Sequence, residues 1–300
     1  MIKTKIRQPV AERLFTVFSY IMMTVFMIIC IYPFYYILIY SISDPVKANF
    51  GVFLLPVGLD FTSYIRILTR PDIPGAFIIS ILRTVSATVL TVLASSMFAY
   101  LMTQKHILFK KFIYRFVIIT MYLHAGLIPW YVTMRAYGLG NNFLLYILPG
   151  AVNAFFIILV KTYIEQLPSS IEESASIDGA GFFTIFFKII FPLAKPIVAT
   201  VAVFTAVGAW NSWMDNFLLV RDPNLQTLQM VLYYYLREAD SVARSLERQA
   251  TAAGGLGGGA ISPTSIRMAI TVITVVPILM VYPFLQRYFI KGIMLGAVKG

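Results

Sequence analysis

The sequence has few charged residues. Only 12% of its 300 residues are Asp, Glu, Lys or Arg, whereas soluble domains carry about 25%. Hydrophobic residues make up 59% of the chain, and the mean hydropathy is +0.81. This composition excludes a soluble domain, because too few polar residues are left to cover a water-facing surface. It predicts an integral membrane protein.

Residues that form disulfides or bind metals are scarce. The single cysteine, Cys30, lies in an apolar run, so a disulfide framework within the chain is excluded. The two histidines, His106 and His124, lie in different predicted elements with no carboxylate or thiol at ligand spacing, and we expect no metal site. No nucleophile–base arrangement and no paired acids occur, which argues against a membrane-embedded enzyme.

A phosphate-binding loop of the Walker type is also missing. The glycine-rich run over residues 254–259 is not followed by Gly-Lys-Ser or Gly-Lys-Thr, so we interpret it as a flexible link. The chain is therefore expected to bind no cofactor of its own. If the system uses ATP, another subunit hydrolyses it.

Six apolar segments are long enough to cross a bilayer, which requires roughly 20 residues. They lie near residues 14–40, 78–102, 112–131, 143–163, 197–220 and 268–290. Prolines inside or near several of them are compatible with membrane helices, because neighbouring helices can satisfy the freed carbonyls. We predict an all-α membrane protein with a cytoplasmic N-terminus over residues 1–13 and one transmembrane domain over residues 14–300.

The basic residues are unevenly distributed between the connections. They gather before the first segment, between the second and third, around residues 165–196 and at the C-terminus, whereas the third-to-fourth connection holds only Arg135. Cytoplasmic connections are enriched in Lys and Arg. Both termini and the 165–196 loop are therefore predicted to be cytoplasmic. The net charge of +11 is then mostly a consequence of topology and does not indicate a nucleic-acid partner.

The loop over residues 165–196 begins with the signals of a short helix. Pro168 ends the element before it, and Ser170 with Glu173 has the spacing of a capping box. Glu172 and Glu173 fall in the predicted first turn, where the helix dipole favours negative charge. A capped helix is therefore expected between the fourth and fifth apolar segments.

The same loop continues with stop signals and a second helix. Gly179 and Gly181 can end the first helix in a left-handed turn. An amphipathic helix is then predicted over residues 182–191, closed by Pro192 and Pro196. The expected result is a helix–turn–helix between two membrane segments.

This loop resembles a known motif. Residues 173–180, Glu-Ser-Ala-Ser-Ile-Asp-Gly-Ala, followed by Ile189 and Pro192, resemble the EAA loop of membrane permeases of ATP-binding-cassette importers, with Ser174 in place of the first Ala. In that family the loop is a coupling helix that docks into a groove on the cytoplasmic ATPase. The resemblance implies an ATPase-coupling role for Glu172, Glu173, Ser174, Ala175, Asp178, Gly179, Ala180 and Gly181.

The resemblance extends over essentially the whole chain. Residues 281–300 and the Trp210-Asn211-Ser212-Trp213 stretch are similar to permeases of maltose-type carbohydrate importers, nearest to the branch for oligosaccharides and for fragments of polysaccharides such as alginate and pectin. It implies a bacterial cell-membrane complex with a second, homologous permease, two copies of an ATPase that binds ATP and magnesium, and an extracytoplasmic solute-binding protein. The chain would form half of a path that opens alternately to either side of the lipid bilayer.

The second apolar segment contains small residues at intervals of four. These are Ala87, Thr91, Ser95 and Ala99. Small residues at this spacing let helix backbones approach closely in lipid. We interpret them as packing residues and not as part of the path.

Four polar or aromatic residues are candidates for the substrate path: Arg83, Asn153, Trp210 and Asn211. Arg83 either reaches to the outer surface or faces an anionic substrate such as an acidic oligosaccharide, because no acidic residue is expected at its depth. Trp210 and Asn211 either belong to an aromatic belt at the membrane surface or contact a sugar. For Trp213 the belt is favoured.

A transporter or channel that does not use ATP is the alternative function. It requires charged relay residues within the spans or a selectivity signature. Apart from Arg83, the predicted spans contain neither. Co-purification with an ATPase subunit would distinguish the two functions.

Overall fold

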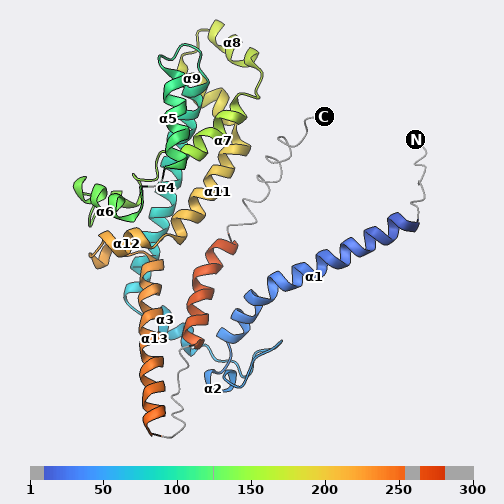
Figure 1. The fold of residues 1–300 in the computed structure, drawn as a ribbon, viewed down its shortest axis with the longest axis vertical. Coiled ribbons are helices and arrows are strands. Elements are labelled where there is room, and N and C mark those ends of the chain that lie inside the picture. Colours follow the sequence, from blue (N-terminus) through green and yellow to red (C-terminus); the bar gives the residue numbers. More distant parts are fainter. Residues whose placement is uncertain (1–9, 124, 254–263, 281–300) are drawn as a thin grey trace. The chain divides into compact units, whose positions relative to one another are not determined.

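The computed structural model describes residues 10–123, 125–253 and 264–280 (Figure 1). In these residues the regular structure is helical, apart from one isolated antiparallel bridge between Ser43 and Leu59. This confirms the predicted all-α class for the described part of the chain. The internal contacts divide the chain into two compact units, Met1–Leu68 with Leu236–Ile273 and Thr69–Tyr235 with Thr274–Gly300.

The first unit contains a long, uncovered apolar helix. α1 (Val10–Ser41) has 32 residues and includes the predicted segment 14–40. A helix of that length extends about 48 Å, which exceeds the thickness of a bilayer core. Only its last three residues, Ile39, Tyr40 and Ser41, are buried. An apolar surface that its own unit leaves uncovered is suited to contact with other membrane helices or with lipid.

Two short helices follow α1 in the same unit. α2 (Pro45–Ala48) is capped by Asp44, whose carboxylate accepts hydrogen bonds from two backbone amides of the helix. α3 (Thr62–Leu68) follows a loop. Ile39, Tyr40, Ala48 and Val52 form a small core against which Met268 packs. The chain after α1 is therefore folded rather than extended.

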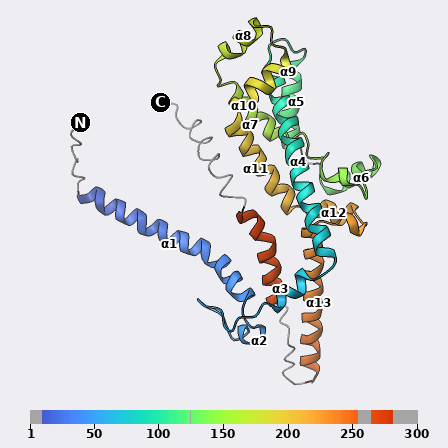
Figure 2. The ribbon, with the colours of Figure 1, turned by 180° about the vertical axis from the view of Figure 1, so that it is seen from behind.

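The second unit is built around one long helix. α4 (Asp72–Thr103) contains the predicted segment 78–102 and lies against α7 (Ala154–Ile164) and α11 (Lys195–Asn211), as both ribbon views show (Figure 1 and Figure 2). Twelve residues of α4 are buried along its length. The helix thus forms the centre of this unit.

The small residues of α4 form its contact surface. Ala87, Thr91, Ser95 and Ala99 are all buried, and Ser95 and Ala99 have no exposed surface. The Thr91 hydroxyl donates to the backbone carbonyl of Gly150 at 3.1 Å. Their predicted role in helix packing is confirmed.

The predicted segment 112–131 is not a single helix. It is divided between α5 (Lys110–Tyr122) and α6 (Leu127–Ala136). Gly126, between them, has a φ of 85°, a backbone angle that breaks a right-handed helix and that glycine adopts readily. Pro129 then lies in the first turn of α6, where a missing backbone N–H costs little.

The next two predicted segments are also interrupted. Residues 143–163 contain the short helix η1 (Phe143–Tyr146) and, after a turn, α7. Residues 197–220 contain most of α11 and then α12 (Met214–Leu219), separated by Ser212 and Trp213. The apolar composition of these segments did not reveal the breaks, because both sides of each break are apolar.

The C-terminal part of the described chain contains three more helices. η3 (Pro223–Leu225) leads into α13 (Leu228–Ala253), and a last helix covers Thr264–Met280. Residues 281–290 of the predicted sixth segment, the glycine run 254–259 and the C-terminal stretch 281–300 lie outside the described residues.

Length and composition alone identify few complete spans among the described residues. α1 and α4 are each long and apolar enough to cross a membrane. A third crossing results if Phe182–Leu193 and Lys195–Asn211, which meet at an angle of 81°, are counted as one bent span.

Candidate functional site

The loop between α7 and α11 contains a separate short helix. α8 (Ser169–Ile177) begins directly after Pro168 and is followed by Gly179 in a left-handed conformation, with a φ of 81°. The Ala180 amide donates to the Ala175 carbonyl at 3.0 Å across this turn, which closes the helix end. The predicted left-handed turn at Gly179 is therefore present.

Two details of the predicted first helix of the loop are wrong. Ser170 lies inside α8 and Pro168 occupies the cap position without a side-chain hydrogen bond, so the capping box of Ser170 and Glu173 does not form. A capping side chain must precede the helix, and here the helix starts immediately after the proline. Gly181 has a φ of −76° and does not share the left-handed turn. It precedes the next helix instead.

α8 is attached to the end of α4 by Glu172. The Tyr100 hydroxyl donates to Oε1 of Glu172 at 2.8 Å, and Nε2 of Gln104 donates to the same oxygen at 2.7 Å. Tyr100 is completely buried. Hydrogen bonds to a charged acceptor are stronger than those between neutral groups. Glu172 therefore fixes the short helix to the longest helix of its unit.

Aromatic stacking supports the same attachment. The Tyr100 ring stacks on Phe182 and Phe186, with ring centroids 4.9 Å and 5.5 Å apart. Ala175 of α8 is buried in the same hydrophobic cluster, together with Val160 of α7. One face of α8 is thus held against the helices that form the second unit.

The second part of the loop is helical but bent. α9 (Phe182–Ile185), a π-helical turn η2 (Phe186–Ile190) and α10 (Phe191–Leu193) follow one another without a gap. Pro192 lies within this helical stretch and does not close it, because a proline is tolerated in the first turn of α10. The stretch ends at Leu193, and α11, which starts at Lys195, meets it at an angle of 81°.

The opposite face of α8 points away from the chain. Glu173, Ser174, Ser176 and Asp178 are exposed, and the Ile177 side chain is 86% exposed. An apolar side chain next to two carboxylates on a short, anchored helix can contact a partner without rearrangement of the loop. The predicted coupling residues therefore divide into an anchored set, with Glu172 and Ala175, and an exposed set.

Arg83 is paired inside the chain. Its side chain is 5% exposed, and Nη2 lies 2.5 Å from Oδ2 of Asp215, whose side chain is 14% exposed. Nη1 donates to Oδ1 of Asp215 at 3.2 Å and to the Ser212 carbonyl at 3.1 Å. The guanidinium also lies over the Tyr146 ring, 4.6 Å from its centroid. The expectation that no acid lies near Arg83 is wrong, and the side chain does not reach to a surface.

Asn216 extends this polar cluster. It is completely buried, and its Nδ2 donates to the Tyr146 hydroxyl. That hydroxyl donates to the Leu225 carbonyl at 2.7 Å. The cluster of Arg83, Asp215, Tyr146 and Asn216 therefore links α4, η1, α12 and the end of η3. Asp215 lies inside the predicted fifth segment, residues 197–220, so a search of the predicted spans for a carboxylate would have found it.

The other predicted path residues lie in different environments. Trp210 is buried, its Nε1 donates to the Thr274 carbonyl at 3.3 Å, and Phe77 contacts it edge-on. Asn211 is exposed at the end of α11. Asn153 is also exposed and accepts a hydrogen bond from the Phe156 amide, which makes it the cap of α7. Stacking of a sugar on Trp210 is therefore not supported.

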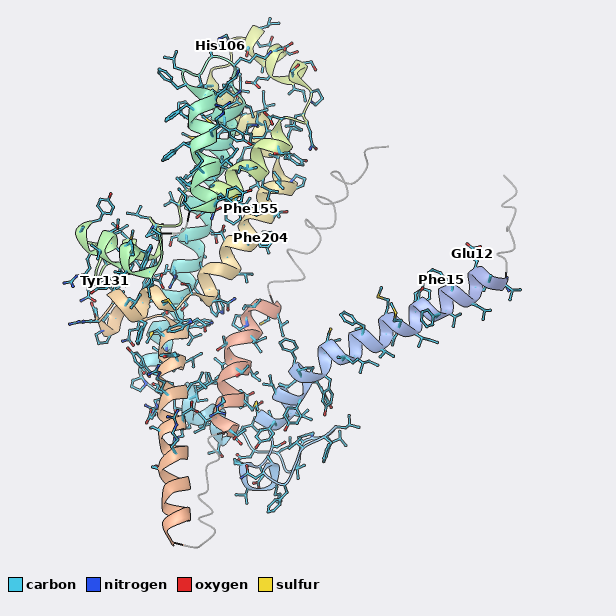
Figure 3. All side chains as sticks on the ribbon, in the orientation of Figure 1. Glu12, Phe15, His106, Tyr131, Phe155 and Phe204 are labelled. Atoms are coloured by element: carbon cyan, nitrogen blue, oxygen red, sulfur yellow. The ribbon has the colours of Figure 1, made fainter. Side chains whose placement is uncertain are left out.

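Two further observations concern predicted residues near the site. Trp213 is half-buried and stacks on Tyr233 at 4.6 Å between centroids, which is a contact within the chain. No group of three His, Cys, Asp or Glu side chains is placed to hold a metal ion within the described ranges. His106 lies near the α8 end of its unit (Figure 3), and His124 is outside the described residues.

The sequence of the chain is similar to those of a known protein family and of several permease proteins. Residues 91–295 match the family described as binding-protein-dependent transport system inner membrane component. The chain is 33% identical over 293 residues to the polygalacturonan/rhamnogalacturonan transport system permease protein YtcP of Bacillus subtilis, covering 96% of this chain and 99% of that protein. It is 26% identical over 274 residues to the melibiose/raffinose/stachyose import permease protein MelC of the same organism, covering 89% and 91%.

A solved structure is also similar. A chain from the crystal structure of a bacterial ABC transporter involved in the import of the acidic polysaccharide alginate superposes with a TM-score of 0.81 at 31% identity, covering 94% of this chain and 99% of that one. The family match spans Tyr100, the whole of α8 and Asp215. The family match therefore includes the residues that attach α8 to α4. It also includes the cluster around Asp215, apart from Arg83, which precedes the matched range.

Proposed function

Because the chain belongs to the family of binding-protein-dependent transport system inner membrane components, we propose that it is a permease subunit of an ATP-driven importer of oligosaccharides or polysaccharides. Members of this family are multi-pass inner-membrane proteins and transport components rather than enzymes. The sugar class is supported by relatives whose names specify polygalacturonan, rhamnogalacturonan and raffinose-type sugars.

The observation that carries the proposal is the two-sided structure of α8. One side is anchored through Glu172 and Ala175 to the core of the second unit, and the other presents Glu173, Ser174 and Asp178. A helix with these two faces can receive a movement from an ATPase and pass it to α4. We assign α8 as the coupling helix.

The proposed topology follows from the distribution of basic residues. Six crossings place the loop over residues 165–196 between the fourth and fifth spans on the cytoplasmic side, together with both termini. The interrupted segments then combine short helices within single crossings. Broken helices at membrane depth are compatible with a transporter where they line a cavity or are buried in protein.

The proposed complex needs several partners. A second, homologous permease would complete the path, two ATPase copies would bind ATP and magnesium, and an extracytoplasmic solute-binding protein would deliver the sugar. The exposed apolar surface of α1 supports contact with the partner permease or with lipid. Within the path, the exposed Asn153 and Asn211 offer amides to sugar hydroxyls, while Arg83 and Trp210 support the wall from behind.

The test is reconstitution of the complex in proteoliposomes with the Glu173→Lys variant. Glu173 is exposed and contributes nothing visible to the fold, so the charge reversal should leave the complex assembled and abolish ATP hydrolysis stimulated by substrate and binding protein. The control is Glu12→Lys, which makes the same charge change at an exposed residue of a different helix, α1. Normal stimulation in Glu173→Lys would contradict the assignment of α8, and uptake without any ATPase would favour the alternative of a secondary transporter or channel.

A further inference from the structure

The second unit contains a pocket that the coupling site does not use. It has a volume of about 270 Å³ and lies where α6 meets the chain that follows α12. Figure 3 shows Tyr131 on the α6 side of this region. Its polar lining comes from Tyr131, Arg135, Asn141 and Arg221, and its apolar lining includes Leu218 and Leu219. Aromatic, apolar and cationic groups thus converge on one hollow.

Asn141 gives the pocket a fixed frame. It has a φ of 51°, a left-handed angle that costs energy for a residue other than glycine. Three hydrogen bonds hold it there. Its backbone N–H donates to the Leu219 carbonyl at 2.9 Å, and its side-chain Oδ1 accepts from the backbone N–H groups of Arg221 at 2.5 Å and Asp222 at 3.0 Å. The backbone that carries Arg221 is therefore tied to the loop after α6.

The two arginines of the pocket are available for a ligand. Arg135 donates through Nη1 to the Tyr131 hydroxyl at 3.1 Å, which uses one of its five donors and turns it towards the pocket side of α6. Both arginines are exposed, and no ion pair joins either of them to a carboxylate in the described part of the chain. The residues that line the hollow include no Asp or Glu.

We propose that this pocket binds the carboxylate of an acidic sugar residue on the extracytoplasmic side of the importer. Two guanidinium groups match the planar, two-oxygen geometry of a carboxylate, while Leu218 and Leu219 offer apolar contact to the carbon face of the ring. The exposure of both arginines keeps the binding weak, as a transit site requires. The inference rests on the proposed saccharide import and on the orientation that puts Arg135 outside.

The test is a binding titration with one oligosaccharide in two forms. The assembled permease–ATPase complex, in nanodiscs without binding protein, is titrated with trigalacturonate and with its carboxyl methyl ester, which has the same rings and no charge. Arg135→Gln and Arg221→Gln are compared singly and together. Arg66→Gln, at an exposed arginine on α3, is the matched control for the loss of one positive charge.

The expected result is selective loss of the charged ligand. Each pocket variant should weaken trigalacturonate binding about fivefold, as expected for the loss of one exposed charge contact of about 1 kcal/mol, and the double variant should weaken it further. Binding of the methyl ester should be weak and unchanged in all variants. High salt should reduce trigalacturonate binding to the unmodified complex and have little effect on the double variant.

Three outcomes overturn the inference. Equal trigalacturonate binding in the unmodified complex and the double variant removes the pocket as the site, and equal binding of acid and ester removes the carboxylate as the recognised group. If neither sugar binds but the double variant loses affinity for the solute-binding protein, the arginines dock a protein instead. Uptake by the unmodified complex separates this failure from that of the proposed function: absent uptake of every saccharide rejects saccharide import itself.

Discussion

Removing the Glu172 carboxylate is expected to release α8 from α4. Glu172→Ala deletes the acceptor of two hydrogen bonds and leaves the Tyr100 hydroxyl and the Gln104 amide without it. Bonds to charged groups contribute about 1.5–3 kcal/mol each when buried. Glu172 is half-buried, so about 1 kcal/mol for each bond is the appropriate scale. The attachment should therefore weaken by about 2 kcal/mol.

Hydrogen exchange at the backbone amides of α8 measures this attachment directly. A local opening that becomes about 2 kcal/mol easier should exchange roughly 30-fold faster. Tyr100→Phe removes one of the two donors and should increase exchange about fivefold. Glu172→Gln keeps an oxygen acceptor in the same place without the charge, so exchange should increase less than in Glu172→Ala.

The double variant Glu172→Ala, Tyr100→Phe separates a direct contact from two unrelated effects. If the hydroxyl acts through the carboxylate, adding Tyr100→Phe to Glu172→Ala should change exchange little, giving a coupling energy of about 1 kcal/mol. Fully additive effects would refute the reasoning, as would unchanged exchange in Glu172→Ala. The same variants should lower stimulated ATP hydrolysis in the same order, because a loosely attached coupling helix transmits less of the movement.

Two further predictions follow from the site and its topology. Arg83→Gln or Asp215→Asn should each lower the thermal stability of the complex, because breaking a buried pair costs about 3–5 kcal/mol. The apolar double replacement Arg83→Met, Asp215→Leu should recover most of that stability. Selective slowing of acidic-sugar uptake by Arg83→Gln in an intact complex would contradict this structural role. In a Cys30→Ser background, a cysteine at the exposed Ser174 should react with impermeant thiol reagents only from the cytoplasmic side, and one at Phe50, 89% exposed, only from outside; the reverse pattern would contradict the proposed orientation.

Local patterns in the sequence predicted local structure well. The turn at Gly179 follows from a glycine after a short polar helix, and the packing surface of α4 follows from small residues at intervals of four. Both patterns depend on neighbours within a few positions along the chain. The all-helical class likewise follows from apolar segments too long for strands.

The pairings between distant residues could not be predicted in this way. Arg83 and Asp215 are 132 positions apart, and Tyr100 and Glu172 are 72 apart. Nothing in either local sequence specifies the partner, because the contact depends on how the helices pack. The break at Gly126 was missed for another reason: a single glycine in an apolar run is also tolerated within a membrane helix.

The 81° angle at Ala194 changes the direction of any force that reaches the coupling loop. The helical stretch from α9 to α10 joins α11 at Ala194, whose side chain is only 1% exposed. A force along that stretch reaches α11 nearly at a right angle to the α11 axis. We therefore expect α11 to rotate about Ala194 rather than to slide along its own axis. A larger side chain at Ala194 would have no room there and should stiffen the joint or change its angle. The size of one small residue would then set how far α11 swings for a given movement of the ATPase.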